Sequence, residues 1–405
     1  MIGFTERDDV MPARLLPPVP ADAPVPSAKS RSMVRPLLIG LLAGVVLGAG
    51  VGAVMIALDS RVLANVFAGY DAAGWAWPLL LLLAALGSIF MHEMGHVIGG
   101  LSVGVRFGLL IVGPLRVERE PSGKLTFGLN KDIATGGGIA ALYPEDQRDL
   151  VRRCAWMIAT GPIGSVVTAV LCLAVMAALS PRTAAWSFFA TLAGMSLGIA
   201  LATLATMRAG YFLTDGARLP QLRRGGPAAE RDAAMLSLLA TQSTAASMDS
   251  WDRATVLASI APCDGSIFEL QGRTFAYGWA LSRGAIDDAR DQMQRAMAIS
   301  AGLPPVLRGA LENELAFMDA MYPPAGTAPA VAEPPKAPGV PEYARLRTLA
   351  AVAVSRGGFP AAQASLDAAR RLHADGKSTA KGGDSWELDR LREIEARMTH
   401  EHVTR

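Results

Sequence analysis

The sequence predicts a mostly α-helical membrane protein with about four transmembrane helices, a small β-element after the second helix, and a cytoplasmic helical region behind them. Three observations predict this class. Of the 405 residues, 51% are hydrophobic and 18% are charged, and the mean hydropathy is +0.30, which is too apolar for an ordinary soluble protein. Apolar runs long enough to cross a bilayer recur in the first half of the chain. Beyond residue 215 the chain becomes polar and contains no further run of that kind.

Charge and cysteine usage exclude several classes of protein. The formal net charge is +2 and the basic residues form no long run that would neutralise a row of phosphates, so nucleic acid is not an expected partner. Cys154 and Cys172 fall in an apolar stretch and Cys263 lies far from them, so no disulfide framework is implied. Two of the five histidines, His92 and His96, lie close together and single out one locus.

The chain before the first apolar run is expected to be a disordered cytoplasmic tail. Residues 1–35 are rich in Pro and small residues and show no apolar periodicity that could build a core. Residues 36–58 carry no charge and are long enough to cross a bilayer core of roughly 30 Å. Glycines recur in this run at every fourth position from Gly40 to Gly52, which favours close packing against another helix.

Three more membrane helices are expected after the first. Trp75 and Trp77 open the second of the four at the membrane interface. Basic residues are frequent in the tail, after His96 and after residue 207, whereas residues 61–71 contain one. Both termini are therefore expected on the cytoplasmic side of a multi-pass protein, in a lipid bilayer that we take to be a bacterial inner membrane. The three helices are predicted at about residues 75–98, 154–180 and 184–207.

Short apolar runs between the second and third helices predict a small sheet. They cover residues 105–112 and 125–129, and turn-forming residues separate them at Gly113-Pro114 and at 121–123. Irregular backbone of this kind is tolerated at membrane depth where protein or a water-filled cavity satisfies it.

The second half of the chain is expected to be a cytoplasmic helical region that binds a protein partner. A pattern of small and large apolar residues begins at Gly284 and again at Gly357, and it is typical of the turn and second helix of tetratricopeptide repeats. Two ordinary Ala-rich amphipathic helices would fit it equally well. The predicted divisions are a membrane-embedded domain at 36–225, helical segments at 226–321 and 343–405, and a Pro/Ala-rich linker at 322–342.

The motif His92-Glu93-Met94-Gly95-His96 predicts a catalytic zinc site. Residues four apart lie on one face of a helix, so His92 and His96 can present two imidazole nitrogens to one zinc ion, with Glu93 beside the metal-bound water. Such ionisable residues are costly at the end of a membrane helix unless they face a cavity and serve a function.

A catalytic zinc ion generally takes three protein ligands, so one must come from elsewhere in the chain. Asp215 is the best candidate, because it follows the fourth apolar run and the expected topology returns it to the membrane face that carries His96. Gly216 would allow a tight turn beside a metal. The residues alone fit a simple helix-terminal Asp-Gly turn about as well.

The three motifs together resemble the site-2 protease family of intramembrane zinc metalloproteases. They are HEMGH at the end of a membrane helix, Gly161-Pro162 in the next helix, and Asp215-Gly216 after the following one. The resemblance covers about residues 75–225. It implies that His92, His96 and Asp215 bind Zn²⁺, that Glu93 is the catalytic base, and that the substrates are membrane-anchored proteins cut in or near their transmembrane segments.

Two departures from the family pattern affect substrate alignment rather than zinc binding. The family carries an Asn three residues after the Pro of its Gly-Pro motif, where this chain has Ser165. A Ser hydroxyl donates one hydrogen bond and an Asn amide two, so Gly161, Pro162 and Ser165 are tentative substrate-binding residues. The Asn and Pro residues that the family has before its Asp-Gly are replaced by Arg208-Ala209-Gly210-Tyr211.

The expected function is intramembrane proteolysis. An edge strand at 105–112 would hold the unwound substrate by backbone hydrogen bonds, so Pro substitutions there should block cleavage and spare the zinc. Deleting residues 226–405 should change substrate choice and leave the zinc in place.

Two alternatives stay open. One is a catalytically weakened membrane scaffold whose helical region binds partners, which Ser165 favours slightly. The other is a membrane-anchored zinc peptidase for soluble or lipid-modified peptides, in which the third ligand is generally a Glu from another helix.

Overall fold

The structure is a computed structural model that describes residues 14–24, 61–120, 123–130, 137–144, 146, 148–205, 208–209, 212–242, 248–301, 305–324, 340–374 and 384–404. Contacts divide the chain into two compact units. The apolar unit consists of residues 31–240, and the helical unit combines residues 1–30 with 241–405. The membrane helix predicted at 36–58 lies outside the described residues.

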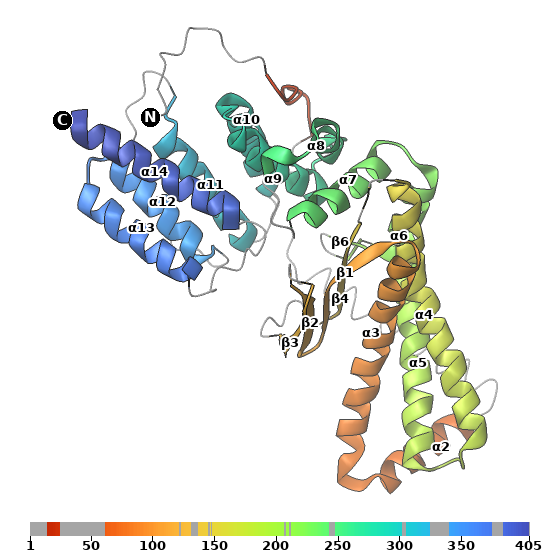
Figure 1. Cartoon of the computed structure of the whole chain (residues 1–405). Helices are drawn as coiled ribbons and strands as arrows, with labels where there is room; N and C mark the ends of the chain where they lie inside the picture. The colour runs from red at the N-terminus through yellow and green to blue at the C-terminus, as the bar shows by residue number, and fades with distance from the viewer. Residues whose placement is uncertain are drawn as a thin grey trace. The chain divides into compact units, whose positions relative to one another are not determined.

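Three long helices form the body of the apolar unit. They are α3 (Trp77–Ser102), α4 (Leu150–Ala178) and α5 (Ala184–Leu204), and they pack side by side (Figure 1). A 3₁₀ turn, η1 (Gly74–Ala76), leads into α3, and Pro78 in the first turn suits a helix start. Among the described residues these three helices are long and apolar enough to cross a membrane. The helices predicted near 75–98, 154–180 and 184–207 are therefore confirmed.

The surface of these helices suits a lipid surround better than water. A water-soluble protein rarely exposes a large contiguous apolar surface. In the apolar unit, however, many large aliphatic side chains are more than a third exposed, including those of Leu79, Leu82, Leu83, Ile163, Val166, Val167, Val170, Leu171, Leu173, Leu201 and Leu204. The protein is compatible with residence in a membrane.

A helix replaces the simple connection expected at residues 61–71. Helix α2 (Arg61–Ala72) packs against α5 at the end of the three-helix body far from the sheet (Figure 1). Tyr70 donates a hydrogen bond to Thr191 at 2.7 Å. A Cβ added to Gly69 would lie 2.0 Å from Ser187 Oγ, so only glycine permits this approach. Trp75 is 89% exposed just beyond it, as expected of an interfacial anchor.

The small sheet contains four antiparallel strands in the order β3-β2-β1-β4. They are β1 (Val105–Val112), β2 (Leu115–Arg119), β3 (Leu125–Leu129) and β4 (Ile139–Pro144). The strands predicted at 105–112 and 125–129 are confirmed, whereas β2 and β4 were not predicted. The expectation that 105–112 is an edge strand is wrong, because β1 pairs with both β2 and β4. Buried side chains of β1, β4 and α3 form the core beneath it.

A short excursion brings the chain from α5 back to the three-helix body. Strands β5 (Arg208–Ala209) and β6 (Phe212–Leu213) pair antiparallel, and α6 (Asp215–Arg224) starts directly afterwards. A Cβ added to Gly216 would lie 1.9 Å from the Leu204 carbonyl oxygen, so glycine is needed where α6 meets the end of α5.

Helix α7 (Pro227–Gln242) packs against the apolar unit, although the sequence places residues from 226 onward in the cytoplasmic region. Ala229 is fully buried in a cluster with Cys154, Ile158 and Leu222. Asp232 lies 3.5 Å from Arg218 and accepts a hydrogen bond from Gln221, both on α6. The contacts thus place the division near residue 240 rather than at 225.

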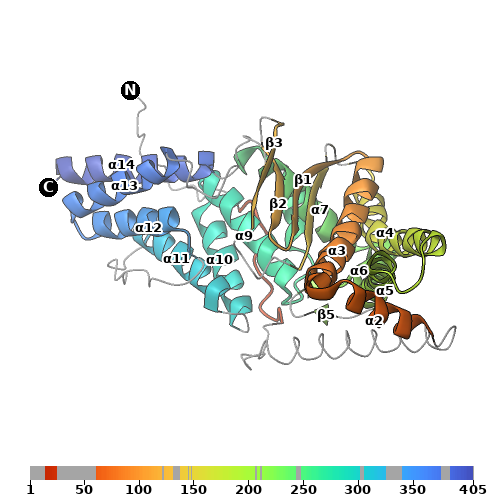
Figure 2. The ribbon, with the colours of Figure 1, turned by 90° about the horizontal axis from the view of Figure 1, so that it is seen from below.

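The helical unit is a succession of antiparallel helices, each packed on its neighbour in sequence (Figure 2). Two hairpins within it are equivalent. Gly284 and Gly357 have φ angles of +71° and +74°, and the following residue donates in each case to a carbonyl five positions back, at 2.9 and 2.8 Å. The helices are α8 (Arg253–Ile260), α9 (Ile267–Ser282), α10 (Ile286–Ser300), α11 (Pro305–Met321), α12 (Glu342–Ser355), α13 (Phe359–Ala374) and α14 (Asp384–Thr404), with a 3₁₀ turn η3 (Met248–Ser250) before them.

The repeated pattern of small and large residues lies where α10 and α13 pack on the helices before them. Six of its eight apolar positions are buried, namely Ala289, Met293 and Ala296 in α10 and Ala362, Leu366 and Ala369 in α13, and the other two, Ile286 and Phe359, are half-buried. The repetition of the hairpin is therefore a property of the fold. Its assignment to the tetratricopeptide class stays a prediction.

Residues 14–24, expected to be part of a disordered tail, pack instead on the helical unit. Leu16 is 2% exposed, and the backbone of the segment bonds to side chains of α8 and α10. Low hydrophobicity predicts that such a segment cannot form a core of its own. It does not prevent docking on a core that other residues have built.

Candidate metal centre

Two histidines of α3 start the site. His92 and His96 lie one helical turn apart, with ring centroids 4.9 Å from each other, and their side chains are 6% and 13% exposed. This places both imidazoles on the face of α3 that packs against α4. The pairing expected from the spacing of the motif is present.

Asp215, the first residue of α6, converges on the same point. Its Oδ2 lies 3.4 Å from His92 Nε2 and 3.5 Å from His96 Nε2, and the three candidate ligand atoms all lie within 4.8 Å of one another. Zn–ligand distances of about 2.0–2.1 Å in a tetrahedral site require ligand atoms about 3.3–3.4 Å apart, and the separations of Asp215 from the two histidines match that requirement. Asp215 therefore joins the two histidines in one candidate donor set, although it lies 119 positions beyond His96 in the sequence.

The charge state of Asp215 suits a ligand role. Burial disfavours the ionised carboxylate, but hydrogen bonding and charge from His92 and His96 outweigh that effect and lower the pKa of Asp215 to about 2. The group is thus an anion at neutral pH.

The other ring nitrogens are held by neighbours on α4. His96 Nδ1 lies 2.8 Å from the Met157 carbonyl oxygen, which can only accept, so Nδ1 carries a proton and Nε2 is the nitrogen whose lone pair the neutral ring would offer to a metal. His92 Nδ1 lies 3.0 Å from Ser165 Oγ, and the same tautomer lets it donate to that hydroxyl. Partners of this type orient metal-binding histidines. Ser165, a tentative substrate-binding residue, therefore contacts a candidate ligand.

Glycines allow α3 and α4 to approach closely enough to make these contacts. A Cβ on Gly161 would lie 2.3 Å from the His96 ring, and one on Gly95 would lie 2.3 Å from the Thr160 carbonyl oxygen. A Cβ on Gly164 would lie 3.0 Å from the Cα of Gly95. Small residues at helix interfaces are typical of membrane helix pairs. Gly161, also a tentative substrate-binding residue, provides the space that His96 occupies.

Glu93 faces the sheet rather than α4. The Ala140 backbone N–H donates to its carboxylate, and a Cβ added to Gly138 would lie 2.5 Å from Oε1. Strand β4 thus orients the candidate base. The sequence carried a signal of this contact in the run Gly136-Gly137-Gly138 before β4, because glycine marks a close approach of backbone to another group.

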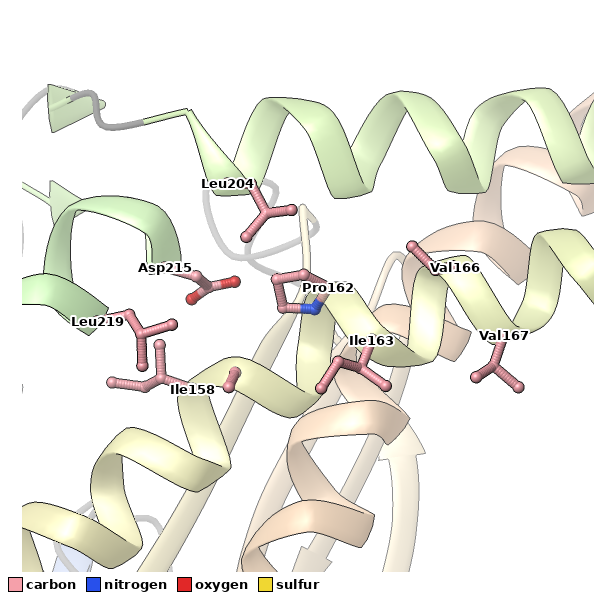
Figure 3. Close-up of a pocket in the computed structure, with 9 residues that line it drawn as sticks. Ile158, Pro162, Ile163, Val166, Val167, Leu204, Asp215 and Leu219 are labelled. Atoms are coloured by element: carbon pink, nitrogen blue, oxygen red, sulfur yellow. The ribbon is translucent and has the colours of Figure 1, made fainter. Parts of the chain in front are cut away.

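An apolar pocket of about 320 Å³ opens beside Asp215. Figure 3 shows the Asp215 carboxylate between Leu219, Leu204 and Pro162, and Asp215 is the one charged residue among the described residues that line the pocket. Pro162 lies inside α4 and removes one helical hydrogen bond here, because it has no N–H to donate to the Ile158 carbonyl. Pro162, the third tentative substrate-binding residue, lies at a cavity next to the donor set.

Comparisons with known proteins add no relative. No protein-family model matches the chain, and no curated protein or solved structure matches it significantly. The resemblance to the site-2 protease family therefore stays a prediction from the three sequence motifs.

Proposed function

We propose that this chain is an intramembrane zinc metalloprotease that hydrolyses peptide bonds in or near the transmembrane segments of membrane-anchored proteins. The observation that carries the proposal is the convergence of His92 Nε2, His96 Nε2 and Asp215 Oδ2 inside a unit of three apolar helices. Structural ion pairs have no need of two histidines whose far nitrogens are both held by α4.

The residues divide the chemistry among them. His92, His96 and Asp215 would hold Zn²⁺, which supplies a bound water of lowered pKa and polarises the substrate carbonyl. Glu93 would be the base that takes up the proton of the attacking water and delivers it to the leaving amine. The Ala140 N–H holds the Glu93 carboxylate in place between these two transfers.

The apolar pocket suits a transmembrane substrate. Its lining of Ile158, Ile163, Val166, Val167, Leu204 and Leu219 offers an extended segment an environment like the bilayer, and the pocket ends at Asp215. A helix must unwind before its peptide bonds reach a metal, and an unwound backbone needs hydrogen-bond partners. Strand β4 can provide them, since it is an edge of the described sheet and already contacts Glu93.

The two alternatives fare differently. A membrane-anchored peptidase of the other type would take a Glu from another helix as third ligand, whereas among the described residues the donor that joins both histidines is Asp215. A weakened scaffold stays a candidate, because Ser165 stands where the family has Asn. Activity measurements separate it from the protease.

The test compares wild type with Glu93→Gln and Asp215→Ala, each purified for zinc analysis and co-expressed with membrane-anchored candidate substrates. We expect Glu93→Gln to keep its zinc and to lose roughly 10²- to 10⁴-fold in cleavage rate, the usual contribution of a general base. Asp215→Ala should lose both zinc and cleavage. The matched control is Glu230→Gln, which removes an exposed carboxylate of α7 and should change neither.

Two results would contradict the proposal. Undiminished cleavage by zinc-loaded Glu93→Gln would exclude Glu93 as the base. Zinc-loaded wild type that cleaves none of the candidates would favour the scaffold.

A further inference from the structure

The N-terminal segment of residues 14–24 is held through its backbone by a buried carboxylate. The N–H groups of Leu15 and Leu16 both donate to Asp288 Oδ2, at 2.7 and 3.1 Å. Asp288 is 2% exposed and lies in the first turn of α10, where the helix dipole favours a negative charge. Within the described part of the chain, these two bonds are the ones that its carboxylate makes, and its other oxygen is buried without a partner. The hydrogen-bond donors for the Asp288 carboxylate are thus the backbone N–H groups of the segment.

Arginine side chains hold the carbonyl groups of the same segment. Arg253 donates from Nε to the Leu15 carbonyl at 2.8 Å, and Arg295 donates to the Pro24 carbonyl at 3.0 Å. Arg295 is itself fixed by two hydrogen bonds to the fully buried Glu269, at 2.8 and 3.0 Å. A planar guanidinium held by a carboxylate presents its remaining donors in a set direction. The helical unit therefore offers donors and acceptors preorganised for an extended backbone.

Side-chain recognition is confined to few positions. Leu16 is 2% exposed, whereas Pro17, Pro18 and Pro20 are exposed. Prolines carry no N–H and favour an extended polyproline conformation, so they lose little entropy on docking. Arg14 adds an exposed ion pair with Asp291 at 2.6 Å. The segment thus binds like a linear peptide ligand, with one buried leucine between a basic residue and a run of prolines.

Residues 14–24 belong to the same chain as the surface that they cover, and this tethering decides how strongly they compete with a partner segment. Because the segment belongs to the same chain as the helical unit, its effective concentration at this surface is at most about millimolar. Leu16 is the one side chain that the segment buries fully. An anchor of this size is small for a permanent part of a fold and common for a bound peptide. A partner segment of the same chemistry could therefore replace it.

We propose that this surface, formed by Arg253, Asp288 and Arg295, is a docking site for extended protein segments of the pattern Arg-Leu-Leu-Pro-Pro, and that residues 14–24 are its displaceable occupant in cis. The partner is a protein that carries such a segment. The segment has two successive residues with backbone N–H groups, the second of them a leucine, and prolines follow. Binding of the partner releases the N-terminal tail. The proposal does not depend on catalysis at the zinc site.

The experiment uses the full chain with a specific protease site placed between residues 26 and 34 and a fluorophore attached enzymatically at the N-terminus. After the linker is cut, fluorescence anisotropy reports whether the labelled fragment stays bound, and a synthetic peptide of residues 12–24 is titrated as competitor. We expect the peptide to displace the fragment, and a peptide with Leu16→Asp to be at least about tenfold weaker. Asp288→Asn in the protein should weaken fragment binding to a similar degree, because an amide accepts more weakly than a carboxylate.

The matched control is Asp291→Asn, which removes only the exposed ion pair with Arg14 and should change binding less than about threefold. Circular dichroism and zinc content of each variant establish that the protein is folded. A fragment that no concentration of peptide displaces would make the segment a permanent part of the fold and overturn the proposal. Equal competition by the Leu16→Asp peptide would also overturn it, because the contact would then lack specificity.

Discussion

The hydrogen bond between His92 and Ser165 gives this serine a place in the candidate centre that its sequence position did not suggest. Ser165 is fully buried, and its Oγ lies 3.0 Å from His92 Nδ1. We infer that it orients His92 rather than a substrate. The same contact offers a reason for a short side chain at this position, where α3 and α4 approach closely at Gly95 and Gly164.

Ser165→Ala should weaken zinc binding. The substitution removes the acceptor of His92 Nδ1 and leaves a buried N–H unpaired, and loss of such an outer partner typically costs about 10- to 100-fold in metal affinity. Competition with a zinc chelator measures the affinity in the purified protein. The control is Thr168→Val on the same helix, because the Thr168 hydroxyl donates to the Gly164 carbonyl and contacts neither histidine. If the zinc affinity of Ser165→Ala is unchanged, Ser165 does not support the metal centre, and a role in substrate binding is favoured instead.

The histidine pair could be predicted from the sequence, because four-residue spacing on a helix is a local property. Asp215 required the resemblance, since the residues alone fit a helix-terminal turn equally well. The partners of the histidines could not be predicted. Met157 acts through its carbonyl group, which every residue has, and Ser165 lies 73 positions from His92. Such contacts depend on how two helices are packed, not on a pattern within one of them.

At the scale of elements, strand β4 has the position that the sequence assigned to residues 105–112. It pairs on one side with β1, and among the described strands it has no neighbour on the other. Its Ala140 N–H already reaches Glu93, and successive N–H groups of a strand point to alternate sides. The Leu142 N–H therefore points to the same free edge. Pro substitutions in β1 would instead break pairing on both sides and unfold the sheet.

Ala140→Pro should reduce cleavage and leave zinc binding intact. The proline removes the N–H that holds Glu93 and disturbs the edge on which an unwound substrate would pair, but it touches none of the three candidate ligands. Ala140→Gly is the matched control, because it removes the methyl group and keeps the N–H. Cleavage of a membrane-anchored substrate and zinc per chain are measured for both. A loss of cleavage that is equal in the two variants would point to the side chain instead of the backbone.

Long apolar runs made the three long helices α3, α4 and α5 predictable, and the Gly-Pro and Pro-Ser-Gly breaks marked the turns of the sheet. Strand β2 was missed because Arg116, Glu118 and Arg119 make it polar, with no buried residue to reveal an alternation. Strand β4 was missed because Ala140 and Ala141 give little β signal. Both strands are stabilised by backbone pairing with β1, which their own residues do not reveal.

At the scale of the whole molecule, the helical unit is held by buried charges as well as by its apolar core. Arg347 is fully buried, forms ion pairs with Glu314 and Glu387, and stacks on Phe317 and Trp386. Burial raises the pKa of Glu387 to about 7, against the lowering effect of Arg347 and with the help of the nearby Glu314. Two carboxylates around one guanidinium leave an excess negative charge that a proton neutralises.

The helical unit should lose stability as pH rises from about 4.5 to about 7. The folded state keeps a proton on Glu387 up to about pH 7, whereas the unfolded chain releases it near 4.5, so the stabilisation is complete below the lower value and lost through the upper one. Urea unfolding followed by tryptophan fluorescence at several pH values measures the slope. Glu387→Gln should flatten it, and Glu312→Gln, which removes a carboxylate paired with the exposed Arg308, should not. A slope that Glu387→Gln leaves unchanged would exclude Glu387 as its source.

The division of the chain was the part least accessible to prediction. Composition changes after residue 215 and the sequence suggests a boundary at 225, but α7 lies beyond that boundary and still packs Ala229 on the apolar unit. Likewise, residues 14–24 lack any periodicity and are ordered by contacts with residues more than 230 positions away. Composition describes how much apolar surface a segment can bury alone. Helix α7 and residues 14–24 are instead stabilised by contacts with residues from other parts of the chain.

This division changes the expected result of truncation. A chain that ends after Gln242 keeps Asp232 beside Arg218 and Gln221 and keeps Ala229 against Cys154, so α6 should still hold Asp215 in place and bind zinc. A chain that ends after Gly225 exposes that face of α6 and removes its ionic partner, so its zinc content should fall. Zinc per chain in purified, detergent-solubilised protein distinguishes the two. Asp232→Asn in the full chain tests the ion pair without truncation and should give a smaller loss. Equal zinc in both truncations would mean that α6 needs no support from α7, and the membrane-embedded domain would then end at residue 225, as the sequence alone suggests.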